Sequence, residues 1–328
     1  MVISFRQGSN WLTISASIAE PLVVVQQKHV EWFYRGARTL RAVARERGLE
    51  DVFPTAEDCY VCPLCLDGLT IEEFTTRQLT VEHVPPEALG GKELVLTCKD
   101  CNNEQGSKFD GQAVKQQQFA RLFSGQSTKP ETARFTVDGI ASGVEMYVTG
   151  QGSMLLTFPD KITNPAMADH MHMLAETRST DFRFTVESRL RYFPDHARVS
   201  WIRTAYLTAF ALFGWKYILQ QKLQPIREQL ANPTAVTLPL LNTYDPGRDP
   251  GRHEVWIVKE PAEHRSLLVV WGEHGVFLPL PNDPRSLEEL AGSLGTRRDR
   301  PVHYSITGTV IPWPSRPEYL LDPDPIGG

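Results

Sequence analysis

Residues 81–110 read Val-Glu-His-Val-Pro-Pro-Glu-Ala-Leu-Gly-Gly-Lys-Glu-Leu-Val-Leu-Thr-Cys-Lys-Asp-Cys-Asn-Asn-Glu-Gln-Gly-Ser-Lys-Phe-Asp, and the rest of the chain is organised around them. The stretch opens with Glu82 and His83, an acid followed by a side chain that exchanges a proton near neutral pH. It continues into Cys98 and Cys101, a Cys-x2-Cys pair that runs directly into polar residues. An acid–base pair and a thiol pair therefore share one short segment.

A second Cys-x2-Cys pair, Cys62 and Cys65, precedes this stretch. Two such pairs suit tetrahedral Zn²⁺ bound by four thiolates, so we expect Cys98 and Cys101 to complete the site. Cys59 stands upstream of Cys62 and permits a shifted register, although Cys62-Pro-Leu-Cys65 fits the knuckle pattern better. Cysteines in this arrangement indicate metal ligands in a reducing compartment rather than disulfides.

Local signals predict a strand, a loop, a second strand and a helix in this order. Residues 79–81 and 94–96 are short apolar runs typical of strands. Between them, Pro85-Pro86 prevents a helix and Gly90-Gly91 predicts a turn. A helix is expected to begin near residue 100, and Gly106 and Gly111 should shorten or interrupt it.

These residues resemble the HNH endonucleases with a ββα-metal fold, in the subgroup that reads Glu-His-x-x-Pro, Gly-Gly and Cys-x2-Cys-Asn. The resemblance spans residues 62–110 of the 328. The matching positions are Cys62-x2-Cys65, Glu82-His83-Val-Pro-Pro, Leu89-Gly90-Gly91 and Cys98-x2-Cys101-Asn102-Asn103-x2-Gly106-x3-Asp110.

The resemblance implies a role for three residues. His83 would be the general base that activates water, and Glu82 and Asn102 would hold one divalent ion. Oxygen ligands favour hard cations, so Mg²⁺ or Mn²⁺ is expected there, beside structural Zn²⁺ on the four cysteines. Phosphodiester hydrolysis needs both the base and the cation.

Two positions depart from the commoner family pattern. Glu93 stands where an Asn usually helps to orient the base, which leaves the orientation of His83 unexplained. The third position is Asn102 rather than His, with Asn103 as a rival ligand and Asp110 as a supporting acid.

Basic residues near the motif are candidates for binding substrate phosphates. A helix predicted over Lys28–Arg47 carries six basic residues against two acids, so that it is locally positive. A solvated helix face explains these charges equally simply, and the same holds for lysines near the motif. The substrate-binding candidates are Lys92, Lys99, Lys108, Arg38 and Arg41.

Whole-chain properties limit the class of protein. The chain has 328 residues with 41% hydrophobic residues, enough for one large domain or two. Its formal net charge of −5 argues against a generally basic nucleic-acid binder, so any such contact needs local basic faces. No secretory signal stands out, and residues 205–215 are too short an apolar run to cross a membrane. We therefore expect a cytoplasmic protein.

The expected fold class is α+β, a zinc-braced ββα-metal HNH module with extensions on both sides. Four segments are predicted: a strand and helix extension over residues 1–54, the HNH module over 55–125, a C-terminal α+β domain over 131–310, and a disordered Pro-rich tail over 311–328. Residues 199–231 should be helical and split at Gly214 and Pro225. Strands are predicted at Val2–Phe5, Trp11–Ile18, Ala133–Val137, Val144–Val148, Met154–Phe158, Phe182–Val186, Glu254–Lys259, Leu267–Trp271, Val276–Leu280 and His303–Val310.

The first hypothesis is a metal-dependent HNH endonuclease that hydrolyses DNA. A role in defence against phage or foreign DNA rests on analogy alone. One site per chain would nick DNA, and a homodimer would allow double-strand breaks. The alternatives are a catalytically silent, zinc-braced module that binds nucleic acid or protein, and an HNH nuclease directed at RNA.

Overall fold

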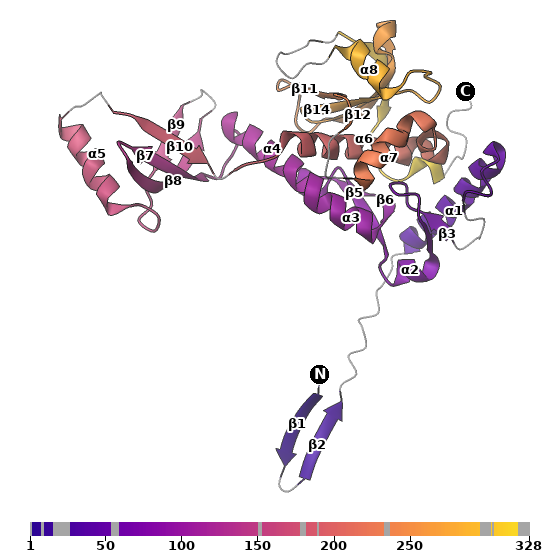
Figure 1. Cartoon of the computed structure of the whole chain (residues 1–328), viewed down its shortest axis with the longest axis horizontal. Coiled ribbons are helices and arrows are strands. Elements are labelled where there is room, and N and C mark those ends of the chain that lie inside the picture. Colours follow the sequence, from indigo (N-terminus) through magenta and orange to yellow (C-terminus); the bar gives the residue numbers. More distant parts are fainter. Residues whose placement is uncertain are drawn as a thin grey trace.

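The computed structural model (Figure 1) describes residues 2–7, 10–15, 27–53, 59–149, 153–177, 182–188, 190–232, 237–295, 303 and 305–320. It has the α+β composition that the sequence predicts. Among the residues that it describes, no helix is both long enough and apolar enough to cross a membrane.

The N-terminal part contains a β-hairpin and a long helix. Strands β1 (Val2–Gln7) and β2 (Asn10–Ser15) pair in antiparallel register. Helix α1 (Gln27–Arg47) agrees with the predicted helix within one residue. Its apolar residues recur at three- and four-residue spacing, and the buried ones among them include Phe33, Leu40 and Ala44. The opposite side of the helix carries the arginines.

The central module contains the predicted ββα unit. Strands β5 (Leu79–Val84) and β6 (Lys92–Cys98) are antiparallel and lead directly into helix α3 (Lys99–Gln105). The helical path continues without a break through the π turn η2 (Gly106–Asp110) into α4 (Gly111–Phe123), so the expected interruption takes the form of a π turn. The smaller elements before and between these are β3 (Cys59–Val61), β4 (Gly68–Thr70), α2 (Ile71–Thr75) and η1 (Glu87–Leu89).

Helix α6 (Pro194–Ile218) is the centre of the main core. It packs against β5 and β6 of the module and against strands of a five-stranded sheet (Figure 1). A break at Gly214 and a following short helix α7 (Gln224–Ala231) agree with the predicted split. The turn η3 (Gln221–Leu223) lies between α6 and α7.

The five-stranded sheet has the order β11-β14-β13-β12-β15, with every pair antiparallel. Its strands β13 and β14 are buried along their whole length, and α6 packs against both. The elements are β11 (Asn242–Tyr244), β12 (His253–Glu260), η4 (Ala262–His264), β13 (Ser266–Trp271), β14 (His274–Leu278), α8 (Leu287–Leu294), β15 (Thr307–Pro312) and η5 (Glu318–Leu320).

Residues 131–188, together with Leu122 of α4, form a second, smaller core. In Figure 1 this part lies beyond the end of α4, with helix α5 (Pro165–Thr177) packed on a sheet of order β10-β7-β8-β9. The strands are β7 (Glu131–Val137), β8 (Ile140–Val148), β9 (Met154–Thr157) and β10 (Phe184–Ser188).

The structure therefore corrects the predicted single domain over residues 131–310. Its first part has its own core, whereas the part from α6 onward shares one continuous core with α1 and the central module. The sequence signal was misleading because the linker-like composition at residues 124–130 marks the start of an inserted unit, not of everything that follows.

The predicted disordered tail also needs correction. Ile311 and Pro312 belong to β15, and Tyr319 is buried against α6. Gly214 makes this packing feasible, because its φ of 64° suits glycine and an added Cβ would lie 2.8 Å from the Cβ of Tyr319. Pro314 and Pro317 are also buried, and the tail beyond residue 320 lies outside the described residues.

Candidate functional site

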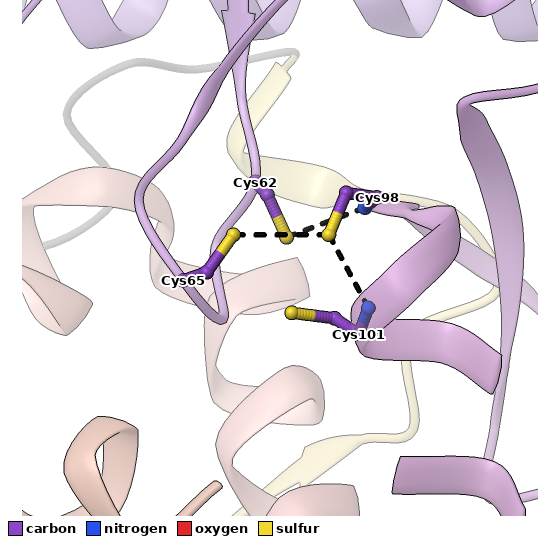
Figure 2. Close-up of side chains that lie close together, drawn as sticks. All are labelled: Cys62, Cys65, Cys98 and Cys101. Atoms are coloured by element: carbon purple, nitrogen blue, oxygen red, sulfur yellow. Dashed lines mark hydrogen bonds between the residues drawn. The ribbon is translucent and has the colours of Figure 1, made fainter. Parts of the chain in front are cut away.

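Four cysteine sulfurs converge at the base of the ββα unit (Figure 2). Cys62 and Cys65 come from the loop after β3, Cys98 ends β6, and Cys101 lies in the first turn of α3. All four Sγ atoms lie within 4.8 Å of one another, and those of Cys65 and Cys98 are 3.7 Å apart. Sulfurs around a tetrahedral Zn²⁺ at about 2.3 Å are separated by similar distances, so the four residues fit structural zinc.

Backbone N–H groups already point at two of these sulfurs. The N–H of Cys98 donates to Sγ of Cys62, and the N–H of Cys101 donates to Sγ of Cys98, both at 3.3 Å (Figure 2). The neighbouring thiol of Cys101, followed by those of Cys62 and Cys65, lowers the pKa of Cys98. The same thiol contacts raise the pKa of Cys65, chiefly through Cys101, and that of Cys101, chiefly through Cys62. Zinc binds the thiolate form, so zinc binding at this cluster would release protons.

The alternative register through Cys59 is not the one that the structure adopts. Cys59 lies outside the cluster, and its Sγ lies 3.9 Å from the carbonyl oxygen of Tyr60. The four predicted zinc ligands are thus the four that the fold brings together.

The loop between β5 and β6 is shaped by two glycines with different tasks. Gly90 has a φ of 85°, a conformation that side chains disfavour. Gly91 approaches the carbonyl of Pro85 so closely that an added Cβ would lie 1.5 Å from the oxygen. The Gly-Gly pair therefore closes the loop that follows His83 against its prolines.

Glu82 and His83 lie on either side of a register shift between β5 and β6. Glu82 is 4% exposed and faces the interior, whereas His83 is half-buried. No hydrogen bond joins the His83 side chain to another described residue, so its imidazole is available to a water molecule.

A buried arginine from α6 holds Glu82. Arg203 donates from Nη2 to Oε2 of Glu82 at 2.8 Å and from Nη1 to Oε1 at 3.2 Å. Its Nη1 also donates to Oδ2 of Asp110 at 3.0 Å, and its Nε donates to Oε1 of Gln105 at 2.9 Å. Ser200 completes the cluster by donating to Oδ1 of Asp110 at 2.6 Å. We call these five residues the arginine cluster.

Burial and charge act in opposite directions on this cluster. Burial lowers the pKa of Arg203, but the carboxylates of Asp110 and Glu82 outweigh it and the net shift is upward. For Asp110, burial raises the pKa to about 6, although Arg203 and Ser200 oppose the rise. Arg203 therefore remains a cation between two acids.

Asn102 is oriented by the strand beside it. Its Nδ2 donates to Oγ1 of Thr80 at 3.0 Å, which leaves its Oδ1 without a partner among the described residues. Glu82 also retains lone pairs that Arg203 does not use. One carboxylate and one amide oxygen suit Mg²⁺, which commonly takes its remaining ligands from water and substrate phosphate. That Glu82 and Asn102 hold one such ion remains a prediction, and Asn103, the rival ligand, is exposed.

Glu93, at the position of the missing Asn, serves a different contact. Its Oε2 accepts a 2.6 Å hydrogen bond from Nζ of Lys28 and lies 3.2 Å from Nε2 of His29. The Lys28 hydrogen bond lowers the pKa of Glu93, with burial opposing it. Glu93 therefore ties α1 to β6. It is the register partner of His83 in β5, but its side-chain hydrogen bonds are to Lys28 and His29.

The predicted substrate-binding residues differ in exposure. Lys92, Lys99 and Arg38 are exposed, and Arg41 is half-buried with its Nη1 inaccessible. Lys108 is exposed but forms an ion pair with Glu104 at 2.8 Å. Their binding of phosphate remains a prediction.

Arg203 was missed at the level of sequence, although a signal was present. It is the charged residue within the otherwise neutral run from Val199 to Leu212. A charge in such a buried helix needs a partner, but the sequence did not indicate that the partner would be Glu82.

Residues 59–118 match a family model described as HNH endonuclease. Searches of curated proteins and of solved structures gave no match. The matched segment includes the four cysteines, Glu82, His83, Asn102 and Asp110, and its family indicates nuclease activity on nucleic acid.

Proposed function

We propose that this chain, whose residues 59–118 form an HNH endonuclease module, is a metal-dependent endonuclease that hydrolyses phosphodiester bonds of DNA. One observation carries the proposal. A half-buried histidine that has no side-chain hydrogen bond to any described residue follows a carboxylate in β5, and α3 carries an amide whose Oδ1 has no partner among those residues. The four thiols lie where the β5–β6 strand pair meets α3, the elements that carry the histidine, the carboxylate and the amide.

In the proposed mechanism, His83 accepts a proton from the attacking water. Its side chain is half-buried, so it is partly accessible to solvent. Glu82 and Asn102 would hold the divalent ion. When bound, that ion supplies stabilisation of negative charge on the phosphate and on the leaving oxygen.

DNA binding would depend on local positive charge, because the whole chain is acidic. Lys92, Lys99 and Lys108 flank the second strand and the helix of the module, and Arg38 and Arg41 lie on α1. Such contacts are independent of base sequence and weaken with salt. We also propose that two copies act together for double-strand breaks and that the role is defence against foreign DNA in the cytoplasm.

The test is nicking of supercoiled plasmid by the full chain. The reaction is run with EDTA, Mg²⁺ or Mn²⁺, using wild type, His83→Ala, and His172→Ala as a control for an exposed histidine elsewhere. Loss of a general base lowers rates by about 10² to 10⁴. We expect metal-dependent nicking by wild type and the control, and its loss in His83→Ala. Full metal-dependent cleavage by His83→Ala would refute the mechanism.

A second candidate is a catalytically silent module that binds nucleic acid or protein. The observation that favours it is the occupation of both Glu82 oxygens by Arg203 at a site that is 4% exposed. It predicts binding that is indifferent to added Mg²⁺. A third, an RNA-directed nuclease, is distinguished by comparing matched RNA and DNA substrates under the same conditions.

A further inference from the structure

Arg203 occupies a costly position. Its side chain is 1% exposed, in a helix surrounded by apolar residues of the main core. Removing a guanidinium from water costs several kcal/mol, and well-packed apolar residues often replace buried ion pairs without loss of stability. Stability alone therefore gives a weak reason for an arginine at this position.

The contacts of Arg203 are directed at the module's acidic residue next to His83. The guanidinium binds Glu82 through two nearly parallel hydrogen bonds, the geometry that fixes a carboxylate in both position and rotation. Its other partners, Asp110 and Gln105, lie on the helical segment that also carries Asn102. Arg203 thus joins Glu82 to the helical segment that carries Asn102.

The same contacts affect His83. Glu82 and His83 are consecutive in β5 and lie at the register shift, so fixing one side chain restrains the backbone that presents the other. The position where the family commonly has an Asn is occupied by Glu93, whose carboxylate is engaged by Lys28 and His29.

Charge in the arginine cluster is unbalanced. One guanidinium faces two carboxylates, those of Glu82 and Asp110, which leaves one negative charge when both are ionised. A cation bound at the free lone pairs of Glu82 would compensate this negative charge. Residues that orient a metal ligand commonly do so by a hydrogen bond to the ligand side chain, as Arg203 does to Glu82.

We propose that Arg203 is a positioning residue that holds the Glu82 carboxylate in the orientation needed to bind a divalent cation beside His83. The effect of this positioning on catalysis rests on the proposed nuclease function. It makes α6 a necessary part of the nuclease site, since this helix supplies the arginine.

The test compares three variants of the full, zinc-loaded chain. Arg203→Lys keeps the charge but cannot bind both oxygens in the same planar geometry, and Arg203→Met removes the charge. Tyr206→Phe is the matched control, because its hydroxyl joins the same helix to the module at the carbonyl of Pro63 and makes no hydrogen bond to Glu82. Pro63 lies between Cys62 and Cys65, so the zinc content of this control must equal that of wild type. Measured quantities are Mn²⁺ affinity by electron paramagnetic resonance, kcat and KM for plasmid nicking, thermal stability and zinc content.

A positioning role predicts that Arg203→Lys weakens Mn²⁺ binding and lowers kcat by roughly 10- to 100-fold, with little change in KM. Tyr206→Phe should retain both values, and all variants should retain their zinc. If Arg203→Met does not fold, the lysine variant alone decides. Lower stability with unchanged Mn²⁺ affinity and kcat in Arg203→Lys would overturn the proposal, because the arginine would then be purely structural.

The proposed function can fail separately. If wild type cleaves no nucleic acid with any metal, Mn²⁺ binding still decides the role of Arg203. Weaker binding in Arg203→Lys but not in Tyr206→Phe supports positioning of Glu82. Equal binding in all variants, or no binding by wild type, overturns it.

Discussion

The hydroxyl of Ser200 donates a 2.6 Å hydrogen bond to Oδ1 of Asp110, and this contact joins α6 to the π turn of the module. Both residues are buried, so water cannot replace the bond when it is removed. Ser200→Ala should therefore lower the free energy of unfolding by about 1.5–3 kcal/mol. Urea denaturation measures this, with Ser124→Ala at an exposed position as the control. Equal stabilities would contradict the contact.

Zinc binding should depend on four of the five cysteines and not on Cys59. Cys65→Ser removes a ligand, so we expect loss of bound zinc and a marked decrease in melting temperature. Cys59→Ser is the matched control, since both residues are half-buried and Cys59 lies outside the cluster. Zinc content by mass spectrometry and melting by circular dichroism provide the comparison. Zinc loss in Cys59→Ser would restore the shifted register.

The two glycines of the β5–β6 loop should respond differently to alanine. Gly90→Ala introduces only backbone strain, about 1–2 kcal/mol, because nothing lies within 4 Å of the added Cβ. Gly91→Ala collides with the Pro85 carbonyl and must displace the loop, so a loss above about 4 kcal/mol is expected. Denaturation of the two variants measures the difference, and similar losses would be inconsistent with the close approach.

Stability should decrease in mild acid because of His274. Burial, with a contribution from Arg248, lowers the pKa of His274 to about 4, whereas an unfolded histidine titrates near 6.5. Between these values the unfolded chain binds more protons, so unfolding becomes easier as pH falls through this window, by up to about 3 kcal/mol.

The matched variant for this effect is His274→Phe, which keeps a ring stacked on Trp201, at a present centroid distance of 4.2 Å, but cannot take a proton. Its stability should vary less with pH between about 6.5 and 4 than that of wild type. His172→Asn, at an exposed histidine, should follow wild type. Parallel pH profiles for wild type and His274→Phe would count against a lowered pKa.

DNA affinity should depend on Lys92 and Lys99. Replacing either with Gln is expected to weaken binding at all sequences and to reduce the slope of log affinity against log salt by about 0.9. Lys161→Gln serves as the control, because Lys161 is exposed and lies within residues 131–188, outside the HNH module. Fluorescence anisotropy at several salt concentrations measures the slopes. An unchanged slope would identify the two lysines as ordinary solvated residues.

The ββα unit and the zinc ligands were predictable because their signals are local. Pro85-Pro86, Gly90-Gly91 and the Cys-x2-Cys pairs act through turn geometry and short spacing, which a sequence displays directly. The partner of Glu82 was not predictable, because Arg203 follows it by 121 residues and only the packing of α6 brings them together. The packed position of Tyr319 was hidden by the surrounding prolines, whose composition indicates disorder more strongly than burial.

The sequence separation of Glu82 and Arg203 has a consequence for synthesis. A chain emerges from the ribosome N-terminus first, so the strand pair and its cysteines are complete long before α6 is available. Under the proposed role of Arg203, a nascent or truncated chain that ends before α6 carries the HNH motif but lacks the contact that sets Glu82. The order of translation would thereby delay nuclease activity until most of the chain has been made.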